Sequence, residues 1–298
     1  MKRNFNFVEK KNLWLFISGI FIIIGISLMI FKSIQREPIL NYGIDFVGGN
    51  TFLLKLNNQS TLDENIASTR LALAPFGLEK SQIQASTDNN LFIKTTTLEK
   101  NITTQLLNSL KNSLGEFEVL EIDFIGPSIG KSLRKQSLLI VLFVSAALLI
   151  YITLRFQISF GIASVFALLH DSLIIFSCAS IFNLEINTPF IAAILTILGY
   201  SINDTIVIFD RIREQTQSDE ISLDATSVNY ALNQTLTRTI NTSLTTLIVI
   251  ASLIFFGGST IREFCIILAI GILSGTYSSL CIASPLLVNL DKKIVQTD

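Results

Sequence analysis

The chain has 298 residues, of which half are hydrophobic and only 15% are charged. A soluble globular domain carries about a quarter charged residues, so this composition excludes an ordinary soluble protein. The net charge of -1 removes the electrostatic basis for nucleic-acid binding, which needs a basic surface. The three cysteines lie in apolar runs and there is one histidine, which argues against a disulfide framework and against any metal site built on two imidazoles.

Six apolar runs are long enough, or nearly so, to cross a hydrocarbon core that takes about 20 helical residues. They span residues 13–31, 138–154, 158–182, 190–209, 240–256 and 264–287. The second and fifth runs are short, and we expect polar flanking residues to complete them. The first run resembles a signal peptide at its basic start. It is longer than a signal-peptide core and has no small-residue cleavage site, which predicts a retained transmembrane helix.

Lysine and arginine residues near the span ends predict the orientation, because cytoplasmic loops are enriched in them. The basic residues cluster at the ends that lie on the same side as the N-terminus, and the short loops of the other side hold only Arg262. We therefore expect residues 1–12 and 289–298 to be cytoplasmic. Residues 32–136 are expected on the opposite side, and residues 137–288 form the main membrane domain.

The segment 32–136 holds 11 basic and 11 acidic residues and has the pattern of a small α+β domain. In chain order we expect a strand at 52–56, a helix opened by the capping box Thr61–Glu64, strands at 83–85 and 91–95, a helix opened by a second capping box at Thr96–Glu99, and a strand at 117–125. This β-α-β-β-α-β order is that of a ferredoxin-like domain. Nothing in it indicates catalysis.

A few polar residues interrupt the apolar runs, where a charge costs about 2.5–3.5 kcal/mol and usually marks a function or a buried pair. Asp204 follows Asn203 in the fourth run, and Arg238 opens the fifth. Thr242 shares a helix face with Arg238, since the two are four residues apart. We interpret Asp204 as a proton-responsive carboxylate whose charge Arg238 balances, with Thr242 as a hydrogen-bonding neighbour. A static salt bridge between two helices is the alternative.

Three further polar residues belong to the same regions of the chain. Asn241 lies beside Thr242, and His170-Asp171 falls about halfway along the third run. Adjacent residues of a helix point about 100° apart, so His170 and Asp171 need not act together. These residues are candidates for a supporting role, and the pair is equally explained by polar contacts with neighbouring helices or with a partner subunit.

The chain resembles the SecD/SecF family of protein-export membrane proteins over nearly its whole length. The resemblance rests on sequence blocks in the expected order and on the expected spans: Gly43–Gly49, Gly126–Gly130, Ala167–Asp171, Gly199–Glu214, Arg238–Thr246, and Gly275–Ser279 with Ala283–Pro285. It implies an α-helical polytopic membrane protein with six transmembrane helices, one half of a pseudo-symmetric RND-type unit whose other half is SecD. In that family the proton-conducting positions correspond to Asp204, Arg238 and Thr242.

The resemblance also implies a function that the residues alone do not give. The chain is expected to work with SecD beside the SecYEG translocon and SecA, in the inner membrane of a bacterium. There the proton-motive force would promote the export of unfolded polypeptides and complete their translocation. The partners are thus SecD, SecYEG, SecA, the exported polypeptides and membrane lipid, with no nucleic acid, no cofactor, no metal and no enzymatic activity.

Three other functions remain as alternatives. An RND-like proton-coupled exporter of small molecules would need a binding cleft in large outer domains. An intramembrane protease would use Asp171 and Asp204 as an acid dyad, although Arg238 near one of them favours two ionised groups over a shared proton. A structural scaffold would need neither Asp204 nor Arg238 to be charged.

Overall fold

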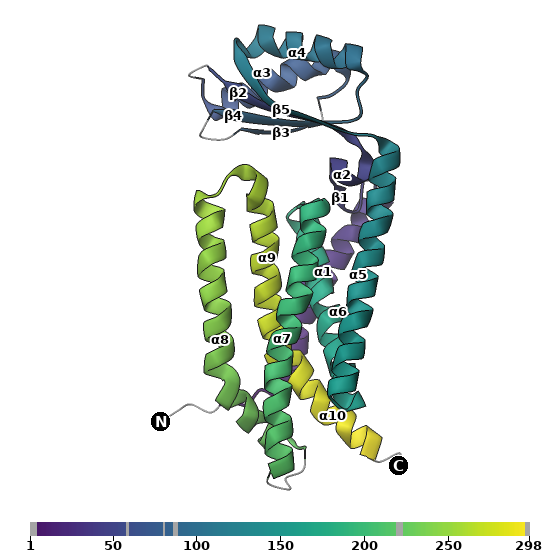
Figure 1. Ribbon diagram of the computed structural model, residues 1–298, viewed down its shortest axis with the longest axis vertical. Helices are drawn as coiled ribbons and strands as arrows, with labels where there is room; N and C mark the ends of the chain where they lie inside the picture. The colour runs from purple at the N-terminus through teal and green to yellow at the C-terminus, as the bar shows by residue number, and fades with distance from the viewer. Residues whose placement is uncertain (1–4, 58–59, 80, 86–88, 219–222, 296–298) are drawn as a thin grey trace. The chain divides into compact units, whose positions relative to one another are not determined.

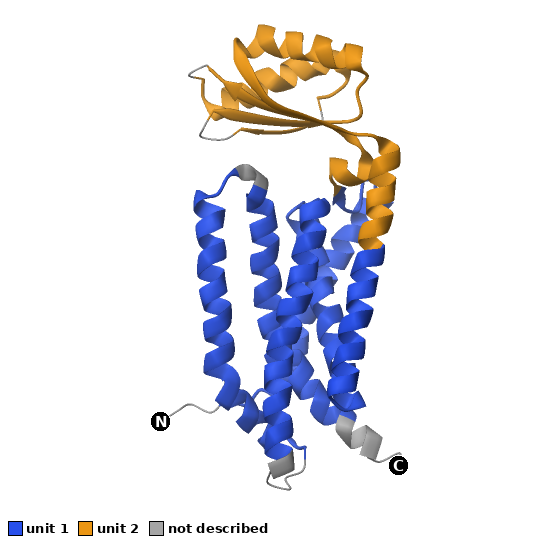
Figure 2. Ribbon diagram, viewed as in Figure 1, with its two compact units in different colours: residues 1–41, 139–298 blue, residues 42–138 orange. Residues whose placement is uncertain are grey.

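The structure is a computed structural model that describes residues 5–57, 60–79, 81–85, 89–218 and 223–295. The chain folds into two compact units, shown in blue and orange in Figure 2. One unit comprises residues 1–41 and 139–298, and the other comprises residues 42–138. Each unit has its own interior, so the two are described separately.

Six helices of the described chain are long and apolar enough to cross a membrane (Figure 1). They are α1 (Lys11–Ile34), α5 (Pro127–Arg155), α6 (Ile158–Ile181), α7 (Thr188–Ser218), α8 (Ala225–Phe256) and a last helix made of α9 (Ser259–Ser278), the π-helical turn η2 (Ser279–Ala283) and α10 (Ser284–Val295). Each predicted apolar run coincides with one of these helices. The expectation of a six-helix membrane protein is confirmed at this level.

Polar residues complete the two spans whose apolar runs are short. The helix α5 starts at Pro127, well before the apolar run begins, and proline is well tolerated in the first helical turn because its missing N–H has no intrahelical partner there. The helix α8 starts at Ala225, directly after a capping box. In this box Asp224 accepts a hydrogen bond from the backbone N–H of Ser227 at 2.8 Å, and the Ser227 hydroxyl accepts one from the backbone of Asp224 at 3.1 Å.

The interior of the larger unit lies where α6, α7 and α9 pack together. More than half of the span in α6 is buried, against 6% in α5 and 11% in α1. Small residues allow the close approach of α9 and α7. A Cβ atom added to Gly271 would lie 2.1 Å from Cδ1 of Ile197, and one added to Gly275 would lie 2.8 Å from Cβ of Ser201. This interface brings the polar residues of the two helices within hydrogen-bonding distance.

The smaller unit contains a four-stranded sheet with two helices on one face (Figure 1). Its elements in chain order are α2 (Ile44–Val47), β2 (Gly49–Leu56), α3 (Leu62–Leu73), η1 (Ala74–Phe76), β3 (Gln82–Ala85), β4 (Asn90–Thr95), α4 (Lys100–Leu114) and β5 (Phe117–Ile125). The strand order is β3-β4-β2-β5, and all neighbouring strands are antiparallel. Two short strands elsewhere in the chain are β1 (Asn41–Tyr42) and β6 (Glu185–Ile186).

The core of this unit joins alternate residues of the central strands to the repeating leucines of α4. Phe52 and Leu54 of β2 face Ile93 and Leu91 of β4 across the ladder, in that register. All four are fully buried, together with Leu106 and Leu110 of α4. Strand side chains alternate between the two faces of a sheet and helical ones recur every three to four residues, so both patterns place apolar residues on the shared interface.

One of the two predicted capping boxes is confirmed and the other is wrong. Thr61 caps α3, since its hydroxyl accepts a hydrogen bond from the backbone of Glu64 at 3.3 Å and the Glu64 carboxylate accepts one from the backbone of Thr61 at 2.9 Å. The helix α4 starts at Lys100 with Glu99 as its N-cap and no capping side chain. The residues before it are held instead by Asn50, whose side-chain oxygen accepts a hydrogen bond from the backbone of Leu98 at 2.9 Å.

Two glycine-rich sequence blocks meet in the smaller unit. A Cβ atom on Gly130 would lie 3.1 Å from the backbone nitrogen of Gly48 and from the backbone of Phe46. Gly48 itself has a φ of 83°, in the region that favours glycine. The start of α5 therefore packs directly on the backbone before β2, which explains the glycines at positions 48 and 130.

Candidate functional site in the membrane-spanning unit

Asp204 lies in the middle of the α7 span and is 4% exposed. Its Oδ2 atom is buried and has no hydrogen-bond partner in the described part of the chain. The Thr276 side chain of α9 and the charge of Arg238 on α8 both act on the carboxylate. Asp204 is thus a buried acid with one unsatisfied oxygen.

Arg238 and Thr242 lie on α8, and both side chains are exposed. Arg238 lines a cavity of about 610 Å³ together with Ile206, Val207 and Asp210 of α7. The ion pairs found among the described residues do not include one between Asp204 and Arg238. The structure therefore places the two residues on packed neighbouring helices without a direct contact between their charges.

The remaining candidates on α7 and α8 make few contacts with the interior. Thr242 donates a hydrogen bond to the backbone oxygen of Thr239 in its own helix at 2.9 Å. Asn203 and Asn241 are exposed. The structure does not bring these three side chains together with Asp204, and they face the surroundings of the unit.

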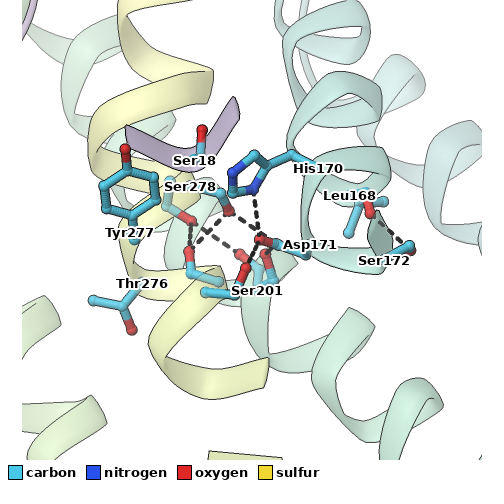
Figure 3. Close-up of polar contacts among 12 residues, drawn as sticks. Ser18, Leu168, His170, Asp171, Ser172, Ser201, Thr276, Tyr277 and Ser278 are labelled. Atoms are coloured by element: carbon cyan, nitrogen blue, oxygen red, sulfur yellow. Dashed lines mark hydrogen bonds and ion pairs between the residues drawn. The ribbon is translucent and has the colours of Figure 1, made fainter. Parts of the chain in front are cut away.

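The best-connected polar residue of the membrane-spanning unit is Asp171, which is fully buried (Figure 3). Its Oδ2 atom accepts hydrogen bonds from the hydroxyls of Ser201 at 2.7 Å and Ser278 at 2.8 Å. Its Oδ1 atom accepts one from Ser274 at 2.6 Å and lies 3.2 Å from Nδ1 of His170. Asp171 therefore links its own helix, α6, to both α7 and α9.

Sequence reasoning missed the three serines that surround Asp171. Ser274 and Ser278 are four residues apart and so share one face of α9, which is a signal that could have indicated them. Ser201 stands in α7 opposite Gly275, and only the close approach of the two helices brings its hydroxyl to Asp171.

Further hydroxyl groups form hydrogen bonds between neighbouring helices in the same unit. Thr205 and Ser279 share a hydrogen bond of 2.8 Å between α7 and η2, and Ser243 and Thr276 share one of 2.6 Å between α8 and α9. Ser279 opens the π-helical turn η2, a form that is rare and often occurs at functional sites. A band of hydroxyl groups therefore extends across α6, α7, α9 and α8, and it includes the partners of Asp171.

The chemistry available here is that of proton binding. Carboxylate, imidazole and hydroxyl groups can all accept or donate a proton. Within the ranges that the structure describes, no three His, Cys, Asp or Glu side chains gather as metal ligands. The contacts of Asp171 go to three serines and to His170, and none joins it to Asp204. The acid dyad of an intramembrane protease is therefore not assembled in this structure.

Comparisons with known proteins agree on one family. A family sequence profile described as "Protein export membrane protein SecD/SecF, C-terminal" matches residues 105–293. The chain is 41% identical over 250 residues to a Protein translocase subunit SecF from Sebaldella termitidis, which covers 83% of this chain and 80% of that protein. It is 35% identical over 302 residues to a Protein translocase subunit SecF from Borreliella burgdorferi, with 99% and 100% covered.

Solved structures give the same result. SecDF from Thermus, described as a translocon-associated membrane protein, superposes with a TM-score of 0.83 at 33% sequence identity. The match covers 97% of this chain and 39% of that one. A SecDF structure in a super-membrane-facing form gives a TM-score of 0.72 and covers 100% of this chain and 40% of the other. The chain thus spans about two fifths of the solved SecDF chains.

Proposed function

Because the chain belongs to the SecD/SecF family of protein-export membrane proteins, we propose that it acts in protein export together with a SecD-like partner and is driven by the proton-motive force. It is a multi-pass bacterial membrane protein. Its match to two fifths of a solved SecDF chain supports a partner that supplies the remaining part. SecYEG, SecA and unfolded polypeptides are the further partners that we propose.

The observation that carries the proton coupling is Asp204, a buried carboxylate with an unpartnered oxygen in the middle of a membrane span. An aspartate can bind and release a proton, whereas an arginine stays charged and serves as a counter-charge. Moving one charge through 100 mV is worth about 2.3 kcal/mol. This amount is enough to change the protonation state of a carboxylate and the contacts around it. Arg238 and Thr242 on the neighbouring helix complete the proposed proton site.

We propose that the smaller unit lies on the extracytoplasmic side and moves during protein export. Its element order, β2-α3-β3-β4-α4-β5, and its antiparallel strand order, β3-β4-β2-β5, support a ferredoxin-like domain. We place it on the outer face of the bacterial inner membrane, with both chain termini in the cytoplasm. In this arrangement it meets the emerging polypeptide, while the proton site works in the membrane.

The test is Asp204→Asn in the full complex with its SecD-like partner, reconstituted in proteoliposomes. Asparagine keeps the size of the side chain and cannot carry a proton between charged and neutral forms. We expect proton flux to fall to the level of empty vesicles and export to lose its dependence on the proton gradient. Flux would be followed with a pH-sensitive dye, and export by protease protection of the cargo.

The matched control is Asp63→Asn, the same change at an exposed position of α3 in the smaller unit. It should leave flux and export at the wild-type level. Gradient-dependent export by an assembled Asp204→Asn complex would refute the proposed proton site. A wild-type complex without proton flux would refute the proton coupling itself.

A further inference from the structure

The buried carboxylate of Asp171 poses a charge problem that the proposed function does not address. It is fully buried in a membrane span. A charge buried in a low-dielectric interior must be paired and hydrogen-bonded. The surroundings of Asp171 therefore determine in which protonation state it can exist.

The contacts of Asp171 are those that suit an ionised carboxylate. Three serine hydroxyls and Nδ1 of His170 surround its two oxygens, two groups to each oxygen. An ionised carboxylate accepts all of these bonds, whereas a protonated one would use one oxygen as a donor. Asp171 thus accepts hydrogen bonds from α6, α7 and α9 at once.

His170 is the group that can supply the matching positive charge. The elements packed against α6 are α1, α7, α9, η2 and α10. Close in sequence to the serines that contact Asp171, their titratable groups are Tyr200, Asp204, Tyr277 and Cys281, none of which is a cation. The lysines of α1 are engaged elsewhere, Lys11 with Asn289 and Lys32 with the backbone oxygen of Ser180.

The remaining charges of the packed elements lie toward the helix ends. In α9 they are Arg262 and Glu263 near its start, in α10 they are residues 291–293, and in α7 they start at Asp210. Arg211 and Arg213 of α7 are paired with Glu214 and Asp210. Among the described residues, the ion pair of Asp171 is therefore with His170 alone, at 3.2 Å.

The second ring nitrogen of His170 provides a place where a proton can enter and leave. The Nε2 atom is buried and has no hydrogen-bond partner in the described chain, while the His170 side chain is only 9% exposed. The Tyr277 ring stacks on the imidazole with 5.8 Å between the ring centroids. In Figure 3 the ring nitrogen that does not face Asp171 lies toward Ser18 and Tyr277. An unpartnered N–H in this position would need an acceptor, and a water molecule or a rotated hydroxyl can provide one.

We propose that His170 and Asp171 form a second proton-binding site of the membrane-spanning unit, which holds one proton as an imidazolium–carboxylate pair. On release the Nε2–H bond breaks and the proton passes to water, leaving a neutral imidazole whose Nδ1–H still donates to Asp171. On loading the same bond forms again. This site rests on the proposed use of protons by the chain and adds a second position to it.

The site is connected to Asp204 through the interface of α7 and α9. Ser201, which donates to Asp171, lies one helical turn before Thr205 and also accepts through its backbone oxygen from the Thr205 hydroxyl at 3.0 Å. Ser278, which donates to Asp171 from α9, is followed directly by Ser279, the partner of Thr205. The charge on the pair therefore acts on the same two helices that hold Asp204.

The first test uses the fact that His170 is the only histidine of the chain. The full chain, labelled with ¹⁵N-histidine in lipid vesicles, gives an NMR signal that reports whether both ring nitrogens carry protons. We expect a larger fraction of imidazolium in the wild type than in Asp171→Asn at the same pH, because the variant lacks the counter-charge. Ser164→Ala, at a buried serine of α6 that bonds only its own helix, should match the wild type. An equal fraction of imidazolium in the wild type and in Asp171→Asn would overturn the proposal.

The second test measures proton flux in the complex with the SecD-like partner. We expect His170→Gln to lower the flux several-fold, because glutamine keeps a hydrogen bond to Asp171 and cannot carry a proton. Wild-type flux in this variant would overturn the proposal even if the chain contains an imidazolium. Asp204→Asn in the NMR experiment separates the two hypotheses. It should keep the imidazolium, and unchanged flux in Asp204→Asn would count against the proposed function and not against the His170–Asp171 pair.

Discussion

At the scale of single residues, the structure treats the two buried carboxylates of the spans in different ways. Asp171 has both oxygens engaged by neighbouring groups, whereas Asp204 keeps one oxygen without a partner. A carboxylate whose oxygens are all hydrogen-bonded holds the helices around it in one arrangement. A carboxylate with an unpartnered oxygen lowers its free energy when it changes its protonation state or its conformation. The two acids are therefore expected to respond differently to substitution around them.

Ser278→Ala tests whether the hydrogen bonds to Asp171 stabilise the packing of the helices. The change removes one hydroxyl that donates to Asp171 and leaves a buried charge with one bond fewer. We expect a loss of about 1.5–3 kcal/mol in the free energy of unfolding, the range for hydrogen bonds to charged groups. The measurement is a denaturant titration of the full chain in detergent. Ser252→Ala is the matched control, because this exposed serine donates only to the backbone of Ile248 in α8. An equal effect of the two changes would contradict the role given to Ser278.

At the scale of helices, small residues set the distance between α7 and α9. Gly271 and Gly275 lie against Ile197 and Ser201, with no room for a Cβ atom. This close approach is what allows Ser201 to reach Asp171 and Thr205 to reach Ser279 across the interface. The π-helical turn η2 then follows at the end of α9. The hydroxyl band therefore depends on helix packing as much as on the residues that form it.

Gly275→Ala tests the packing of these two helices. The added methyl group would lie 2.8 Å from Cβ of Ser201 and 3.2 Å from its Cα atom, so α7 must move away. We expect a destabilisation of about 1–3 kcal/mol from overpacking, and a loss of proton flux, because Ser201 is drawn away from Asp171. Gly199→Ala serves as the control, since a Cβ atom at this position of α7 meets nothing within 4 Å. Wild-type stability and flux in Gly275→Ala would show that the close approach is not required.

At the scale of the whole molecule, the charged residues are concentrated outside the apolar spans. The polar segment 32–136 contains 22 of the 45 charged residues in about a third of the chain. The spans that remain hold few charges, and several of these are engaged near the helix ends. Such a distribution agrees with a membrane-embedded unit joined to a water-exposed one. It also makes the orientation in the membrane a testable property of the whole chain.

Orientation can be tested with single introduced cysteines, because all three natural cysteines are buried. We expect Asp63→Cys, in α3, to react with a membrane-impermeant maleimide added to intact spheroplasts. Glu214→Cys, at an exposed position near the end of α7, should react only after the membrane is opened. The opposite pattern would reverse the proposed orientation, and labelling of the unchanged chain would show that its own cysteines interfere.

The sequence by itself determined the features that follow from local patterns. The six apolar runs form six helices, because a segment without access to water must satisfy its backbone N–H and C=O groups with hydrogen bonds inside the segment. The alternation at 52–56 and the leucines at 106–114 located the core of the smaller unit. Asp204 was identified by its cost in an apolar run. The second capping box shows the limit of such patterns. No side chain caps α4, and Asn50 from a distant strand instead bonds the backbone of Leu98 just before that helix.

Only the tertiary structure decided which polar groups meet. Serine and threonine are common in membrane helices and usually bond to a carbonyl of their own helix, as Ser164 and Ser252 do, so their presence predicts no partner. Ser201, Ser274 and Ser278 donate hydrogen bonds to Asp171 because the rotation and separation of three helices place them around it. The sequence likewise suggested a direct pair of Asp204 with Arg238, and the structure leaves the guanidinium in a cavity between the helices. The chemistry of each side chain follows from the sequence at that position. The contacts between helices depend on how the helices pack, and the sequence of one helix alone does not determine that packing.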